Sequence, residues 1–212
     1  MIIRIVNELF LSNTYLICSK HDNKCLIIDP GSNEIDIDNK LIEQKLEPVA
    51  IFATHGHFDH IGGVSYFKEK YNIPDYMHEA DLKLVKSANF FLRLNKINKM
   101  IKISDPKVLI MDMYKKILIS GFSLEIYNFP GHTNGSCVIK YENNIFTGDT
   151  IFKQGVFINK LPGENVEKLK QSILEIFQTF DSNSICFPGH GSDATLDYIK
   201  LKNHDLINFI NN

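Results

Sequence analysis

The residues that could do chemistry gather first in one short segment dense in histidine and aspartate. It reads HGHFDH, covers residues 55 to 60, and follows the apolar run VAIFAT. That run predicts a buried strand, and a loop held by a strand can direct its side chains toward one point. His55 and His57 lie on the same side of an extended backbone, while Asp59 and His60 follow toward a second point. Four candidate ligands in six residues suit two metal ions better than one tetrahedral zinc.

Three further segments each place one ligand-type side chain beside glycine at the end of an expected strand. They are PGHT with His132, GDT with Asp149 and PGHG with His190. Glycine permits the tight turn and the close approach that a ligand loop needs. The four segments together supply five histidines and two aspartates, a donor set that suits zinc, iron(II) or manganese. Each residue alone could be structural, Asp149 for example as a helix cap, but the whole set in this order favours a metal site.

The other three histidines lack such neighbours. His78 begins the segment HEAD at an expected helix start, and we interpret it as a surface or capping residue. His21 lies in a polar turn and His204 in an expected C-terminal helix. None of the three is therefore a candidate ligand.

The elements that must position the candidate ligands begin with a meander of short strands. IIRIV, NTYLICSK and CLIID predict these strands, and the turn DPG at residues 29–31 ends them. Apolar residues at helical spacing then predict a helix from Ile37 to Leu46, closed by Pro48. Gly62 and Gly63 open a second helix after the histidine-rich segment.

Strands and helices alternate through the rest of the chain. We expect a short strand at residues 76–77, a helix from residue 79, an amphipathic helix over 166–180 and helical structure from 195 onward. Further strands are expected at KKILIS, FSLEIYNF, SCVIKYE, NIFTG and SICF. Strand blocks alternating with helices, twice over, predict two sheets face to face with helices outside. Without a repeat of fixed period or a linker, we expect a single domain over residues 1–212.

An apolar and basic stretch, residues 87–102, is expected to be helical and resembles an insertion from Phe90 to Ile101. It could roof a pocket with apolar surface or pack as ordinary core, and we slightly favour packing.

Composition excludes several classes of function. The chain has 23 basic and 25 acidic residues and a formal charge of −2, so we expect no strong attraction to nucleic acid or to an anionic membrane. No apolar run is long enough to cross a bilayer, and the N-terminus lacks the pattern of a signal peptide. Four cysteines without CxxC spacing predict free buried thiols in a reducing cytosol; they are Cys18, Cys25, Cys137 and Cys186. We expect a cytoplasmic protein.

The motifs THGHFDHIGG, PGHTNGS, TGDT and PGHG, in this order, resemble those of the metallo-β-lactamase superfamily. More narrowly, they look like its glyoxalase II-like (hydroxyacylglutathione hydrolase-like) branch. The resemblance runs from IIDPG to PGHG and implies an α/β fold, the four-layer αββα sandwich. It also implies two divalent metal ions, zinc in first place and iron or manganese as alternatives. It assigns His55, His57 and His132 to the first metal, Asp59, His60 and His190 to the second, Asp149 as the bridge, and Asp29 as a support behind the site.

Differences from the motifs of other superfamily members limit which branch the chain resembles. Zinc β-lactamases of the commonest class have cysteine where this chain has Asp149, and diiron flavoproteins have glutamate where it has His57. Small glyoxalase II-like enzymes usually follow GDT with a segment resembling GRTDLPGG. The corresponding stretch here, residues 157–164, reads FINKLPGE, so the Arg and Asp of that segment are missing. Lys160 lies near their positions and is a weak candidate for contacting substrate.

The resemblance therefore implies a dinuclear hydrolase acting on a small-molecule thioester or ester. S-acylglutathione or a related thioester would be cleaved by hydroxide generated at the metals, with Asp59 as catalytic residue. A thioester suits the site because a thiolate leaves with little protonation. Three alternatives stay open: an esterase or lactonase, a mono-iron persulfide dioxygenase, and a non-catalytic binding protein.

Overall fold

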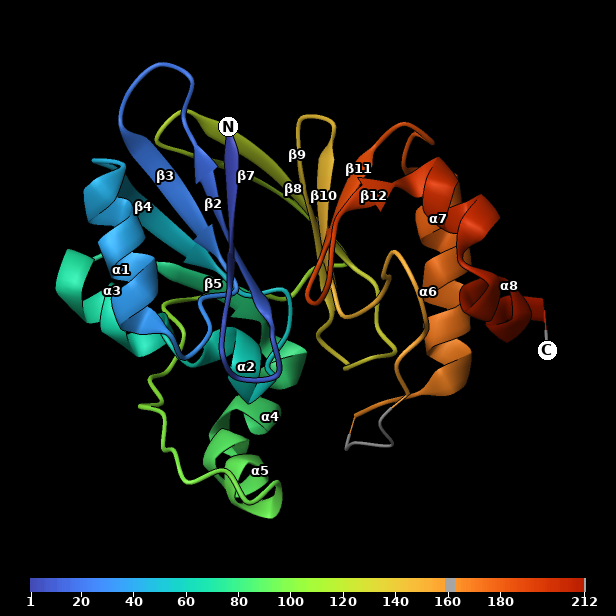
Figure 1. The fold of residues 1–212 in the computed structure, drawn as a ribbon, viewed down its shortest axis with the longest axis horizontal. Helices are drawn as coiled ribbons and strands as arrows, with labels where there is room; N and C mark the ends of the chain where they lie inside the picture. The colour runs from blue at the N-terminus through green and yellow to red at the C-terminus, as the bar shows by residue number, and fades with distance from the viewer. Residues whose placement is uncertain (159–162, 212) are drawn as a thin grey trace.

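Two sheets lie face to face at the centre of the computed structural model, which describes residues 1–158 and 163–211 (Figure 1). The strand order in the first sheet is β1 (Ile2–Val6), β2 (Asn13–Cys18), β3 (Lys24–Ile28), β4 (Glu47–Phe52), β5 (Asp75–His78) and β6 (Val108–Ile110). The order in the second is β12 (Ala194–Thr195), β11 (Ile185–Pro188), β10 (Asn144–Gly148), β9 (Cys137–Tyr141), β8 (Phe122–Asn128) and β7 (Tyr114–Ile119). The pairs β3/β4, β4/β5, β5/β6 and β10/β11 are parallel.

Helices cover the outer faces of both sheets (Figure 1). The first sheet is covered by α1 (Glu34–Glu43) and α3 (Val64–Tyr71), and the second by α6 (Val166–Thr179), α7 (Leu196–Lys202) and α8 (His204–Asn211). Below the strands lie α2 (Phe58–Ile61), α4 (Leu82–Lys86) and α5 (Ala88–Leu94). The 3-10 turn η1 (Glu79–Asp81) directly precedes α4. The predicted αββα sandwich is confirmed.

The alternation of side chains along each strand builds three apolar layers. Tyr15, Ile17 and other inward residues of the first sheet meet Leu124, Phe146 and their neighbours from the second sheet in the inner layer. Residues of opposite parity, such as Leu16, pack outward against α1 and α3. The amphipathic α6 packs on the second sheet in the same way. Since a strand alternates faces with period two, both faces of each sheet can be buried at once. The shared inner layer supports the single domain, which stays a prediction.

Two expected helix boundaries are wrong, and chain turns explain both. The first helix ends at Glu43 because Lys45 turns left-handed (φ 53°), and the Leu46 N–H then bonds the Leu41 carbonyl (2.8 Å). Pro48, expected to close this helix, lies within β4.

The expected helix over residues 87–102 is shorter for the same reason. Lys96 (φ 58°) is left-handed, and the Ile97 N–H bonds the Leu92 carbonyl (2.9 Å), which ends α5 at Leu94. The short strands β6 and β12 were not expected.

The predicted burial is wrong for His78 and right for the four cysteines. His78 accepts the Ala80 N–H (3.2 Å), so the capping interpretation is confirmed, but the side chain is buried and the surface interpretation is wrong. All four cysteines are free and buried, as predicted. In the described part of the chain, no helix has the length and apolarity needed to span a membrane. The cytoplasmic location stays a prediction.

Candidate metal centre

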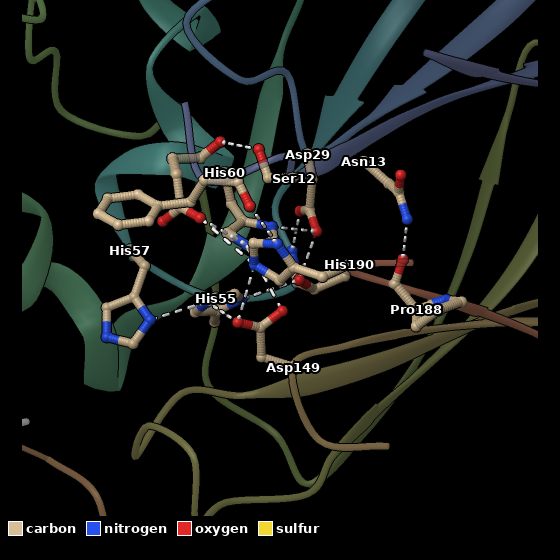
Figure 2. Close-up of polar contacts among 12 residues, drawn as sticks. Ser12, Asn13, Asp29, His55, His57, His60, Asp149, Pro188 and His190 are labelled. Carbon is tan, nitrogen blue, oxygen red and sulfur yellow. Dashed lines mark hydrogen bonds and ion pairs between the residues drawn. The ribbon is translucent and has the colours of Figure 1, made fainter. Parts of the chain in front are cut away.

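The four ligand-bearing segments meet at one edge of the sandwich. His55 follows β4, His132 follows β8, Asp149 follows β10 and His190 follows β11. Figure 2 shows His55, His60 and His190 converging, with Asp149 directed toward them. Asp59 and His60, expected on a turn, lie in the one-turn helix α2, which directs them to the same place.

Three histidines form the first cluster of donor atoms. Nδ1 of His57 lies 3.0 Å from Nε2 of His55 and 2.9 Å from Nε2 of His132. Oδ2 of Asp149 lies 3.5 Å from Nε2 of His132 and 4.0 Å from Nε2 of His55. A tetrahedral zinc with bonds of about 2.05 Å holds neighbouring nitrogens about 3.3 Å apart, so this spacing fits one metal ion.

The second cluster is more regular. Nε2 of His60 lies 3.3 Å from Nε2 of His190, and Oδ2 of Asp59 lies 3.4 Å from each of these nitrogens. Asp149 reaches this cluster too, with Oδ1 3.5 Å from His60 Nε2 and Oδ2 3.4 Å from His190 Nε2. These separations match the edges of a tetrahedron about one metal ion. Asp149 is thus shared by both clusters.

The chemistry of the donor atoms fits a cation. Two facing imidazole nitrogens can share only one proton, yet three nitrogens face one another in the first cluster. Oδ1 of Asp149 is buried without a hydrogen-bond partner among the described residues. Six of the seven candidate ligands are buried, all but His190, and burying such a set without a cation is costly.

A family model described as the metallo-beta-lactamase superfamily matches residues 7–190, a range that holds every candidate ligand. The chain belongs to the metallo-beta-lactamase superfamily.

Related proteins match this chain over nearly its full length. The "Probable metallo-hydrolase MJ0888" of Methanocaldococcus jannaschii is 33% identical over 196 residues, which cover 90% of this chain and 93% of that protein. The structure titled BLEG-1 B3 metallo-beta-lactamase is 28% identical with a TM-score of 0.89, covering 97% of this chain and 99% of that one. TTHA1623, solved in a di-iron-bound form, is 26% identical with a TM-score of 0.81, covering 95% and 98%. This chain is a metallo-hydrolase of the superfamily, whose members bind divalent metal ions.

In this superfamily member, Asp29 lies directly behind the candidate ligands. Its carboxylate accepts hydrogen bonds from the Thr54 N–H (2.7 Å) and hydroxyl (2.6 Å), and Oδ2 lies 3.1 Å from Nδ1 of His60. Because the Thr54 hydroxyl donates to Asp29, it can accept from Nδ1 of His55 at 3.1 Å. His55 and His60 are thereby held with Nε2 facing the site, an arrangement typical of metal-ligating histidines.

The turn between β1 and β2 supports the second cluster. Nδ1 of His190 lies 3.0 Å from the Phe10 carbonyl, and the Ser12 hydroxyl donates to the Asp59 carbonyl (2.8 Å). The bond to Phe10 leaves Nε2 of His190 directed at the site.

Glycine is required where the loops cross. A Cβ on Gly189 would collide with Oδ1 of Asp149 and with the His60 ring. Gly148 is left-handed (φ 50°), and a Cβ there would lie 2.5 Å from Oγ1 of Thr54. A side chain at either position would displace a candidate ligand or its support.

Sequence reasoning missed Asp81, which ties two ligand loops together. Its buried carboxylate accepts from the Gly56 N–H (2.8 Å), the Thr133 hydroxyl (2.7 Å) and the Gly135 N–H (2.7 Å). The first donor belongs to the loop of His55 and His57, and the other two to the loop of His132. The sequence did offer one signal for Asp81, its place just after the strand β5. Because β4 and β5 are parallel, their ends lie at the same edge of the first sheet.

We expect Asp81→Ala to destabilise the protein by about 3 kcal/mol, because it leaves the buried N–H groups of Gly56 and Gly135 unpaired and leaves the Thr133 hydroxyl only its contact with Ser136. It should also weaken binding of the metal that His55, His57 and His132 would hold. Denaturant unfolding and zinc titration measure the two effects, with Asp105→Ala, at an exposed aspartate, as control. Unchanged unfolding and zinc affinity would remove this role from Asp81.

The two clusters differ in their electrostatics. Burial lowers the pKa of His55 well below its usual value and the pKa of His57 to about 4, so both are neutral. Burial opposes charge on His60 too, but the carboxylates of Asp59 and Asp149 outweigh it and raise its pKa well above the usual value. The pKa of His190 rises in the same way, to about 9, against the effect of burial, through its hydrogen bonds with Asp149 and Asp59.

Metal binding should therefore release protons at pH 7. Without metal, His60 and His190 are protonated there, and a ligating imidazole must lose its proton. Since the proton competes with the metal, apparent affinity should rise with pH through about 9, where His190 becomes neutral without metal. Calorimetric zinc titrations in buffers of different ionisation enthalpy measure the release. Heats that do not depend on the buffer would contradict it.

A cavity of about 780 Å³ opens onto both clusters, within the size range of small-molecule sites. Four candidate ligands line it: His57, Asp59, Asp149 and His190. Within the expected insertion, Leu92 and Ile101 pack in the core, and Phe91 packs in the same core cluster while also lining the cavity. The stretch therefore contributes both to the core and to the lining of the cavity. Lys160, the weak candidate for contacting substrate, lies outside the described residues.

Proposed function

We propose that this metallo-hydrolase is a dinuclear thioesterase of the glyoxalase II-like type, which cleaves S-acylglutathione or a related small thioester. The observation that carries the proposal is the shared position of Asp149, within 4.0 Å of His55 and 3.4–3.5 Å of His60, His132 and His190. One carboxylate placed between two sets of ligands is suited to holding two metals side by side. His55, His57 and His132 would hold one ion, and Asp59, His60 and His190 the other.

Bound divalent metals would lower the pKa of water toward neutrality and polarise the substrate carbonyl. The carboxylate of Asp59 lines the cavity, so it can orient the attacking water and accept its proton. Its pKa is lowered although burial opposes this, because His60 and His190 stabilise the charge, and it is therefore ionised at neutral pH. Asp29 and the Phe10 carbonyl keep the histidines in the orientation that binding needs.

The cavity lining favours a leaving group that needs no proton. Apart from the candidate ligands, Arg4 is the one ionisable side chain among the described residues of the lining, and arginine stays protonated. A thiolate leaves without a general acid, whereas an alkoxide or an amine needs one. This supports a thioester over an ester or lactone.

A β-lactam is a second candidate, because a structure that matches this chain with a TM-score of 0.89 is titled a B3 metallo-beta-lactamase. Its amide nitrogen would need the proton that Asp59 takes from water.

A substrate panel on the zinc-loaded protein tests the proposal. It contains S-lactoylglutathione, other acyl thioesters, phenyl acetate, an acyl homoserine lactone and nitrocefin, together with oxygen uptake on glutathione persulfide with the iron-loaded protein. We expect thioesters to give the highest kcat/KM. Faster cleavage of the lactone or nitrocefin, or oxygen uptake with one iron per chain, would replace the thioesterase with the corresponding alternative.

A further inference from the structure

The cavity above the candidate metal centre is lined mainly by large apolar side chains. They come from the β1–β2 turn, α2, α4, α5 and the loop after β10, and they are Phe10, Leu11, Phe58, Leu84, Phe91 and Phe157. Phe58 and Phe91 belong to a packed core cluster, which fixes the wall nearest α2. Of the polar lining residues, Asn95 follows α5, whereas Arg4, Asn13 and Ser192 lie on β1, β2 and the loop after β11 with Val6 beside them. The wall built by α2, α4 and α5 is therefore mainly apolar, and most of the polar groups lie on the opposite side.

Several of these side chains remain exposed around the cavity. Phe10 is 51% exposed, Leu11 65% and Phe157 51%. The Phe10 ring lies 5.6 Å from the Phe58 ring, and the Phe157 ring lies 4.8 Å from that of Phe152, which in turn faces His190 at 6.3 Å. Exposed apolar side chains gathered at a cavity mark a binding surface, because soluble proteins keep few of them in one place.

The conformation of the β1–β2 turn places one of these rings. Phe10 and Leu11 are both left-handed, with φ of 54° and 56°, which is uncommon for bulky residues. The turn is closed by the Asn7 N–H, which donates to the Ser12 carbonyl (2.8 Å). Phe10 therefore has two contacts with the site: its carbonyl holds Nδ1 of His190 at 3.0 Å, while its ring lines the cavity. Such backbone conformations persist when the surrounding structure requires them, often at functional sites.

We propose that the apolar side of this cavity binds the acyl group of the substrate, and that the enzyme prefers thioesters of medium-chain fatty acids or aryl acids to those of small polar acids. The proposal rests on the thioesterase function above and goes beyond it in naming the acyl group. S-lactoylglutathione, whose acyl group is small and polar, would then be a poor substrate.

Binding of product acids tests the cavity without turnover. Acetate, hexanoate and decanoate are titrated calorimetrically into the zinc-loaded protein. All three present the same carboxylate to the metals, so affinity should rise with chain length only if the cavity takes the chain. Phe10→Ala removes the ring but keeps the carbonyl that holds His190, and it should weaken decanoate binding about ten-fold while changing acetate binding less than about two-fold.

Phe90→Ala is the matched control, since Phe90 is 63% exposed and is not one of the lining residues. It should leave both affinities unchanged. Equal affinity for all three acids, or equal weakening of acetate and decanoate by Phe10→Ala, would overturn the proposal.

A parallel kinetic series separates this proposal from the thioesterase function. Acetyl, hexanoyl and decanoyl thioesters should show kcat/KM rising with chain length in the wild type, and Phe10→Ala should flatten the rise through KM. Cleavage of no thioester, with chain-length-dependent binding intact, would overturn the thioesterase function but support the apolar acyl site. Cleavage of all thioesters at rates independent of chain length would overturn the acyl preference alone.

Discussion

Asp149→Asn is expected to reduce bound metal from about two ions per chain to about one and to lower kcat/KM by about a thousand-fold. Asp149 is the one candidate ligand whose carboxylate oxygens lie within 4.0 Å of histidine nitrogens from both clusters, and its Oδ1 has no hydrogen-bond partner among the described residues. The asparagine amide has almost the same volume as the carboxylate but no charge. It should therefore bind metal only weakly at the position between the two clusters. Elemental analysis and thioester assays on the same preparation measure both effects.

The control for this variant is Asp197→Asn, at an exposed position on α7. It should retain two ions and full activity. Two tightly bound ions in Asp149→Asn would mean that the carboxylate does not join the two clusters, and activity within about ten-fold of wild type would show that it is not needed for turnover.

Asp59→Asn is expected to keep the fold and lower kcat by about a hundred-fold to ten-thousand-fold, the range of a lost general base. Asp59 combines two properties: it lines the cavity, and it lies 3.4 Å from two histidines of the second cluster. The variant should therefore also bind its second ion more weakly, so the kinetics are measured at saturating zinc with the ion count checked.

The decisive comparison is kcat at full metal occupancy. A kcat equal to that of wild type would remove the catalytic role from Asp59 and leave it as a ligand only. Asp105→Asn, at an exposed position, serves as control for the charge change.

The sequence predicted the sandwich and the convergence of the candidate ligands because both follow from local patterns. Buried strands end shortly before HGHFDH and at the first residue of GDT and of PGHG, and the ends of the parallel strands β10 and β11 meet at one edge. The histidine-rich segment needed no knowledge of distant residues, since β4 and α2 orient His55 to His60 locally.

Supports that join distant parts of the chain could not be predicted in this way. Asp81 is 25, 52 and 54 positions from its three partners, so its role exists only after the loops pack together. The contact between Phe10 and His190 spans 180 positions and uses a backbone carbonyl, which leaves no mark on residue type. The ends of α1 and α5 were missed because Lys45 and Lys96, which follow them, are left-handed, and that conformation is rare for lysine.

Metal content tests the central claim most directly. The protein is purified without chelator, then stripped, reconstituted with zinc, iron or manganese in separate samples, and analysed for bound ions per chain. We predict about two ions per chain in the best-bound metal, with zinc expected first and iron or manganese as the alternatives. A chain that binds one ion at most, or none, under every loading condition would contradict the assignment of Asp59, His60, His190 and Asp149 to a second site.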